Sequence, residues 1–141
     1  SNDGLRLHYR DYAKAGEDRP PLLCLHGLTR NARDFEPLAA RLSDRWRLIC
    51  PEMRGRGESA YAKDSMSYVP LTYFHDLERL LTDLNLQRFV AVGTSLGGLI
   101  TMLLASTRPD RLAGAVMNDV GPQIEPEGLA RIRGCLLYTS D

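Results

Sequence analysis

The chain has 141 residues, of which 43% are hydrophobic and 26% charged, a composition typical of one soluble globular domain and unlike that of a disordered chain. Its 18 basic and 18 acidic residues cancel and form no basic stripe, which argues against nucleic-acid and anionic-membrane partners. No apolar stretch approaches the roughly 20 residues of a membrane span. Cys24, Cys50 and Cys135 lack metal-ligand spacing, and the first two lie in apolar runs that suit buried free thiols. Since no export leader is visible either, we expect a cytoplasmic protein that binds no metal.

Two strands are predicted at the start of the chain. Residues 4–12 alternate Leu5, Leu7 and Tyr9 with basic side chains, which is the period of a half-buried edge strand. Residues 22–27 form a short apolar run that ends at a glycine, as expected for a buried parallel strand.

A helix, a third strand and a loop are predicted next. Residues 31–44 carry apolar side chains at helical spacing, and either Asn31 or Asp34 is available as the N-terminal cap. Residues 46–52 predict a strand, and residues 53–59 form a glycine-rich loop.

The second half of the chain continues the same alternation. A helix is predicted from Pro70, because apolar side chains recur on one face, and Thr72 is a candidate cap. Residues 88–93 then predict a strand, residues 96–107 a helix and residues 112–119 a further strand. Strands that alternate with helices predict one α/β unit, with a mostly parallel sheet and helices on both faces.

The junction between the fourth predicted strand and its helix has the pattern Gly93-Thr94-Ser95-Leu96-Gly97. Glycines two residues before and after the serine suit a sharp strand–helix turn, in which bulkier side chains would collide. Such a turn exposes Ser95 as a nucleophile at a helix N-terminus, where the helix dipole favours developing negative charge. The alternative is a glycine-rich turn with an ordinary serine, such as one that cradles a phosphate.

Residues 24–29, CLHGLT, supply the second part of an acyl-transfer site. Such a site needs two backbone N–H donors for the oxyanion, one from the residue after the nucleophile and one from an earlier strand–helix loop. We expect Leu96 to provide the first donor and Leu28 the second. Gly27 lets the backbone approach the substrate, and we expect His26 to brace the loop as a structural histidine rather than to take part in the chemistry.

The chain contains, in this order, the four motifs LHGLTRNARDF, RGRGES, VGTSLGG and MNDVGPQIEPEGLARI. Together they resemble the serine α/β-hydrolases, and in particular a bacterial, largely uncharacterised group near the enol-lactonases and esterases. The resemblance covers residues 3–134. It implies hydrolysis of an ester, lactone or related small-molecule carbonyl substrate through an acyl-enzyme on Ser95, without a cofactor. The alternatives are carbon–carbon bond hydrolysis, perhydrolysis, or a non-catalytic small-molecule binder of the same fold.

Two details refine the resemblance. The RGRGES loop is expected to shape the site without entering the chemistry, and the chain has Glu52-Met53 before it where Asp-x is common, which bears on local structure. Haloalkane dehalogenases and epoxide hydrolases resemble this chain but carry an aspartate at the nucleophile, so Ser95 argues against those branches.

The resemblance also implies residues that these 141 positions do not supply. In this family the nucleophile is followed first by the acid and then by the histidine base. His8, His26 and His75 all precede Ser95, so we expect the catalytic histidine to be absent from this chain. Asp119 is a candidate acid at the carboxyl edge of the sheet, and the alternative is that it bonds local backbone in a tight turn.

Residues 1–134 are therefore interpreted as the truncated N-terminal portion of an α/β-hydrolase core, which we expect to be inactive by itself. The last seven residues, CLLYTSD, are interpreted as sequencing-adapter read-through, because one DNA sequence that encodes them contains the end of a transposon-based adapter. A genuine short strand at 135–141 is the alternative, since the segment has fair β-propensity.

Overall fold

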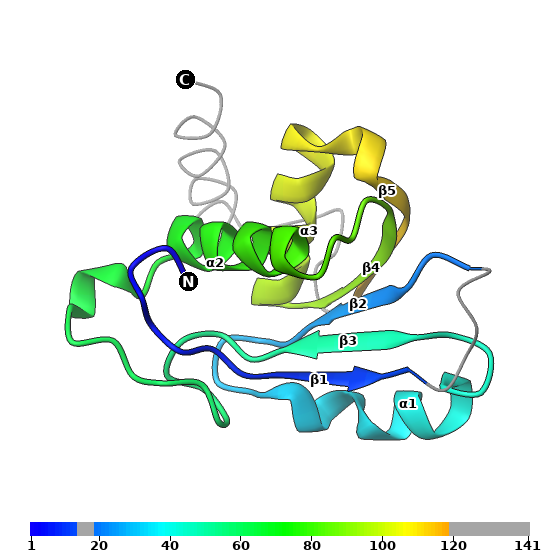
Figure 1. Cartoon of the computed structure of the whole chain (residues 1–141), viewed down its shortest axis with the longest axis horizontal. Helices are drawn as coiled ribbons and strands as arrows, with labels where there is room; N and C mark the ends of the chain where they lie inside the picture. The colour runs from blue at the N-terminus through cyan, green and yellow to red at the C-terminus, as the bar shows by residue number, and fades with distance from the viewer. Residues whose placement is uncertain (14–18, 119–141) are drawn as a thin grey trace.

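A computed structural model describes residues 1–13 and 19–118 (Figure 1). Its strands are β1 (Tyr9–Tyr12), β2 (Leu22–Leu25), β3 (Leu48–Pro51), β4 (Phe89–Thr94) and β5 (Leu112–Asn118). Its α-helices are α1 (Glu36–Leu42), α2 (Pro70–Asp83) and α3 (Leu96–Thr107), and short 3-10 turns occupy η1 (Ala32–Phe35), η2 (Ser65–Ser67) and η3 (Pro109–Arg111). Strands and helices alternate as the sequence predicts.

The five strands form one sheet in the order β1-β3-β2-β4-β5. β1 runs antiparallel to β3, whereas the pairs β2–β3, β2–β4 and β4–β5 are parallel. The carboxyl ends of β2, β3, β4 and β5 therefore meet at one edge, which is where sites form in open α/β sheets. The predicted α/β class with a mostly parallel sheet is confirmed.

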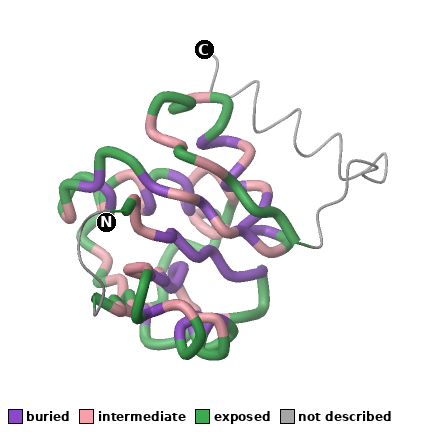
Figure 2. The backbone as a smooth tube through the Cα atoms, turned by 90° about the vertical axis from the view of Figure 1, so that its right-hand side faces the viewer, coloured by how far each residue is buried: buried purple, intermediate pink, exposed green. Residues whose placement is uncertain are grey.

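Helices cover both faces of the sheet, α1 on one and α2 with α3 on the other (Figure 1). β2 is buried at all four positions, because its alternate side chains enter two different cores. Leu22 and Cys24 pack beneath α1, whereas Leu23 and Leu25 pack beneath α2 and α3. Figure 2 shows the buried backbone concentrated in the middle of the molecule.

The edge strand is shorter than its alternating pattern predicts. β1 begins at Tyr9 instead of residue 4, and Tyr9 is exposed. The residues before it bond to the glycine-rich loop rather than to a strand: the N–H of Ala60 donates to the carbonyl of Arg6, and the N–H of Glu52 donates to that of His8. A period of two marks extended backbone, but it does not say whether the partner is a strand or a loop.

Two helix starts differ from the predicted caps. Asn31 accepts a hydrogen bond from the N–H of Arg33, but the turn that it caps is the 3-10 turn η1 that leads into α1. The prediction that Thr72 caps α2 is wrong, because the helix begins two residues earlier at Pro70 with no side-chain cap. Proline suits this first helical position, since its φ is preset and the N–H it lacks would have no partner in the helix.

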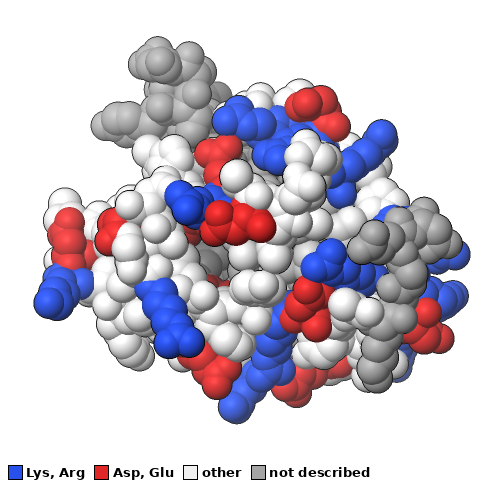
Figure 3. All heavy atoms as spheres, in the orientation of Figure 1, with Lys and Arg blue, Asp and Glu red and all other residues white. Residues whose placement is uncertain are grey.

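Cys24 and Cys50 are buried free thiols, as expected, while Cys135 lies outside the described residues. No helix in the described part of the chain is both long and apolar enough to cross a membrane. Acidic and basic side chains are interspersed over the face seen in Figure 3. Several of these charges lie in pairs, such as Arg47 with Asp11.

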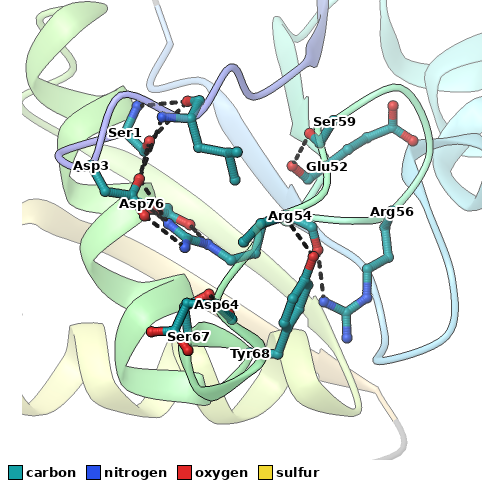
Figure 4. A network of polar contacts seen from close by, with 12 residues as sticks. Ser1, Asp3, Glu52, Arg54, Arg56, Ser59, Asp64, Ser67, Tyr68 and Asp76 are labelled. Carbon is teal, nitrogen blue, oxygen red and sulfur yellow. Dashed lines mark hydrogen bonds and ion pairs between the residues drawn. The ribbon is translucent and has the colours of Figure 1, made fainter.

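The loop that follows β3 is held by buried charged side chains (Figure 4). Glu52 is 4% exposed, and its carboxylate accepts hydrogen bonds from the N–H groups of Ala32 and Glu58 and contacts Nδ1 of His8 at 2.7 Å. Arg54 is also buried, and its guanidinium pairs with Asp76 at 2.7 Å. A buried charge of this kind is stable only when paired or hydrogen bonded, so these contacts fix the loop against the sheet and α2.

The Glu52 contacts predict a dependence of stability on pH. Burial alone would raise the pKa of Glu52, but the N–H groups of Glu58 and Ala32 and the neighbouring His8 outweigh it, and the pKa lies below its ordinary value. This stabilisation is complete above the unfolded-state pKa and is lost as the pH falls through the lower folded-state pKa. Glu52→Gln places an amide N–H against an N–H donor, so we expect it to lower the free energy of unfolding by about 2 kcal/mol at neutral pH.

The measurement is urea unfolding of Glu52→Gln and wild type between about pH 7 and pH 3, where the difference in the free energy of unfolding should narrow once the pH falls below the unfolded-state pKa and continue to narrow as the folded-state carboxylate protonates. Asp44→Asn is the control, because that carboxylate is 79% exposed and makes no contact with Glu52 or His8. A difference that stays constant across this pH range would contradict the assignment.

Candidate active site

Ser95 occupies the sharp turn between β4 and α3, with its side chain exposed. Its backbone has φ 52° and ψ −110°, a conformation that residues other than glycine rarely adopt. The turn is held on both sides, because the Ser95 N–H donates to the carbonyl of Asn118 at the end of β5 and the Ser95 carbonyl accepts from the N–H of Leu99. Such local strain persists only where the surroundings enforce it, and it concentrates at functional sites.

The two motif glycines let the strand and the helix approach closely at this turn. A β-carbon on Gly97 would overlap the carbonyl oxygen of Leu25 in β2 and come within 2.8 Å of its β-carbon. A β-carbon on Gly93 would lie 2.6 Å from the hydroxyl of Thr101, which itself donates to the carbonyl of Gly97. Any side chain at either position would therefore push α3 away from the sheet.

His26 lies at the end of β2 and is fully buried. Its Nε2 accepts a hydrogen bond from the N–H of Met53, so Nδ1 carries the proton and donates to the carbonyl of Gly27 at 2.7 Å. Burial is the main cause that lowers the pKa of His26. The lowered pKa favours the neutral ring, in which one nitrogen donates and the other accepts, as these two hydrogen bonds require. His26 thus links the loop after β2 to the loop after β3.

The peptide between Gly27 and Leu28 is fixed in one orientation beside the serine. Its carbonyl accepts from His26 and from the N–H of Arg30, and a trans peptide then directs the Leu28 N–H the opposite way. This N–H has no acceptor among the described residues. A β-carbon on Gly27 would lie 3.7 Å from that of Ser95, so the loop lies against the turn and the glycine leaves open space there.

Leu96 is the first residue of α3, directly after the serine. An N–H at this position has no acceptor within its own helix, and the helix dipole makes its surroundings positive. The structure therefore brings together Ser95 and the backbone of residues 26–28 and Leu96 at the carboxyl edge of the sheet.

The histidines are engaged elsewhere. Both ring nitrogens of His8 contact carboxylates, those of Glu52 and Glu58, and both nitrogens of His26 are hydrogen bonded within the loops. His75 is half-exposed on α2, next to Glu78. Among the described residues, no side chain hydrogen bonds to the Ser95 hydroxyl. The candidate acid Asp119 and the segment 135–141 lie outside the described residues.

Comparison with known proteins places this arrangement in a family. Residues 20–132 match the family described as "alpha/beta hydrolase fold". The chain belongs to the α/β-hydrolase fold family. The resemblance inferred from the four motifs is confirmed at this level.

Several members of the family are similar over most of the chain. The 3-hydroxybutyrate-oligomer hydrolase of Cupriavidus necator is 39% identical over 128 residues, which are 89% of this chain and 44% of that protein. The 2-(acetamidomethylene)succinate hydrolase of Mesorhizobium japonicum is 37% identical over 78% of this chain and 39% of its own length. A crystal structure of an α/β hydrolase from Novosphingobium aromaticivorans is 65% identical, with a TM-score of 0.86 over 95% of this chain and 47% of that one. The chain thus spans less than half the length of these relatives.

One group of described residues in this α/β-hydrolase chain has the donor set of a cation site. His8, Glu52 and Glu58 place three potential ligand atoms within 4.8 Å of one another. The Glu52 oxygens, however, already accept backbone N–H groups, and both imidazole nitrogens face carboxylates. The geometry is that of an internal hydrogen-bonding cluster, and we assign it no metal.

Sequence reasoning missed one residue next to this site. Arg56 donates from Nε to the carbonyl of Leu28 at 2.9 Å. The only sequence signal was its place in the RGRGES loop, which indicated a role in shaping the site without identifying the contact.

Proposed function

We propose that the chain is the N-terminal part of a hydrolase that cleaves an ester, lactone or related carbonyl bond in a small molecule, with Ser95 as the nucleophile. The observation that carries the proposal is the exposed Ser95 in a strained strand–helix turn, with the backbone of Gly27 beside it and Leu96 as the first residue of the helix that follows. We call the complete protein, this chain together with the C-terminal part that its relatives possess, the full-length protein.

In the proposed reaction the Ser95 hydroxyl attacks the substrate carbonyl carbon while its proton passes to a base. The negative charge that develops on the carbonyl oxygen is stabilised by hydrogen bonds from the N–H groups of Leu28 and Leu96. The tetrahedral intermediate collapses to an acyl-enzyme, and the base returns the proton to the leaving alcohol. Water then hydrolyses the acyl-enzyme, with the same base accepting its proton.

The base is a histidine in the C-terminal part of the full-length protein, and Asp119 is the candidate acid within this chain. No step in this scheme calls for a cofactor, and a cytoplasmic location stays a prediction.

Esters are favoured among the candidate substrates. The Cupriavidus necator relative is named as a hydrolase of 3-hydroxybutyrate oligomers, and oligomers of a hydroxy acid are joined by ester bonds.

The test is covalent labelling of the full-length protein with a fluorophosphonate, which reacts with activated serine nucleophiles. We expect labelling of the wild type and its complete loss in Ser95→Ala. Ser106→Ala is the matched control, because Ser106 is an exposed serine of the same helix. Labelling that persists in Ser95→Ala would refute the assignment of the nucleophile.

A further inference from the structure

We infer that Arg56 is a positioning residue for the oxyanion site: its hydrogen bond to the Leu28 carbonyl holds the peptide after Leu28, and so helps to keep the Leu28 N–H in the direction that the Gly27 carbonyl bonds set. The inference rests on the proposed function and goes beyond it, because it gives a side chain of the glycine-rich loop a part in the rate of the reaction.

The backbone of Leu28 depends on hydrogen bonds for its orientation. Its side chain is 52% exposed, so side-chain packing does not hold it. The peptide before Leu28 is fixed through the Gly27 carbonyl, which accepts from His26 and from the N–H of Arg30. The peptide after Leu28 is held by Nε of Arg56, which donates to the Leu28 carbonyl at 2.9 Å. With both flanking peptides fixed, the N–H has one direction before substrate arrives, and such preorganisation is what makes an oxyanion donor effective.

Arg56 is itself rigidly anchored. Its Nη1 donates to the carbonyl of Arg54 at 2.9 Å and to the hydroxyl of Tyr73 at 3.0 Å. The guanidinium also lies over the rings of Tyr73 and Tyr68, 5.1 and 5.7 Å from their centroids. Figure 4 shows the side chain of Arg56 beside Tyr68, whereas the side chain of Arg54 extends away from it toward Asp76. Since Tyr73 belongs to α2, Arg56 connects the Leu28 loop to that helix.

The charge of Arg56 is unbalanced, in contrast to its neighbours. Arg54 pairs with Asp3 and Asp76, and Arg30 pairs with Asp34. Within the described ranges, 1–13 and 19–118, no carboxylate forms an ion pair with Arg56. Burial is the main cause that lowers the pKa of His26, and the positive charge of Arg56 lowers it further. The hydrogen bond to Gly27 and the Glu52 carboxylate act in the opposite direction. The charge of Arg56 therefore acts on the loop after β2, which contains His26. A positive charge held here also favours the oxyanion.

The test compares Arg56→Gln and Arg56→Lys in the full-length protein, with p-nitrophenyl butyrate as substrate. We expect kcat of Arg56→Gln to fall about 30-fold while KM changes by no more than about twofold, because the affected bond forms in the transition state. Lysine keeps the charge, but it lacks the planar guanidinium group that donates to the carbonyls of Leu28 and Arg54 and to the hydroxyl of Tyr73 at once. We therefore expect kcat of Arg56→Lys to fall about tenfold. Arg79→Gln is the matched control: it removes the same charge from the exposed face of α2, where Arg79 is 51% exposed and pairs with Asp83, and its kcat should stay within about twofold.

A transition-state analogue separates positioning from a purely structural role. Trifluoromethyl ketones form a tetrahedral oxyanion on a serine nucleophile, and their affinity should fall in each variant by the same factor as kcat/KM. Fluorophosphonate labelling gives the fraction of folded, competent protein, to which each kcat is normalised. If Arg56→Gln does not fold, the comparison of Arg56→Lys with wild type decides.

Three results would overturn the inference: an unchanged kcat in the Arg56 variants, a change confined to KM, or a fall in kcat with unchanged affinity for the ketone. Ser95→Ala distinguishes failure of the inference from failure of the proposed function. Activity that vanishes in Ser95→Ala but stays at the wild-type level in Arg56→Gln refutes the role of Arg56 alone, whereas activity that survives Ser95→Ala refutes both.

Discussion

Ser95→Ala in the full-length protein should lower kcat for p-nitrophenyl butyrate by about 10⁵-fold to 10⁶-fold. The substitution removes the atom that is proposed to form the acyl-enzyme, so we expect the residual rate to come from substrate binding and from the proposed oxyanion donors, the N–H groups of Leu28 and Leu96, acting on attack by water. Folding should be retained, since alanine is close in size to serine and the turn is held through backbone hydrogen bonds to Asn118 and Leu99.

The measurement is steady-state hydrolysis by purified protein, with a thermal melt to show that the variant is folded. Ser106→Ala, on the exposed side of the same helix, should keep the wild-type rate. A folded Ser95→Ala variant that retains more than about one per cent of the wild-type kcat would contradict a serine nucleophile.

Gly97→Ala should be the most destabilising single-methyl change at the turn. The new β-carbon would overlap the carbonyl oxygen of Leu25, and this atom belongs to the buried backbone of β2, which cannot rotate away as a side chain can. Relief requires α3 to move off the sheet, which opens the core around Ile100 and Leu104. We expect a loss of about 4 kcal/mol or more in the free energy of unfolding, in the range caused by overpacking and cavities in a core.

Urea unfolding of the full-length protein measures this loss. Gly114→Ala in β5 is the matched control, because its β-carbon would meet only the methyl groups of Val90, at 3.9 Å, an ordinary van der Waals distance. The control should change stability by less than about 1 kcal/mol. Equal stabilities for the two variants would show that the close approach of α3 to β2 is not needed.

Much of the fold was predictable because its signals are local. The bounds of α3, 96–107, match the prediction, since a strand, a tight turn and an apolar helix follow one another without interruption around Ser95. The short apolar run of β2 likewise indicated a strand buried on both faces. The family follows from the order of the motifs, which needs no knowledge of contacts.

The missed features depend on partners that lie far away in the sequence. The burial of Glu52 depends in part on the N–H of Ala32, which lies after another strand, and the bond from Arg56 to Leu28 likewise joins loops that follow different strands. A charged residue in a glycine-rich loop usually lies in solvent, so its residue type predicts neither contact. The roles of Asp119 and of a histidine base depend on segments outside the described residues and stay predictions.

The close approach of Gly97 to Leu25 also constrains the order of folding. Residues of α3 and β2 are distant in the chain, so the strained conformation of Ser95 has no support until β4 has paired with β2 and the helix has docked. Contacts between segments far apart in sequence form slowly, since the intervening chain must first be ordered. The native geometry of the Ser95 turn therefore requires that β2, β4 and α3 have assembled, and a chain without this assembly lacks the backbone conformation on which the proposed nucleophile depends.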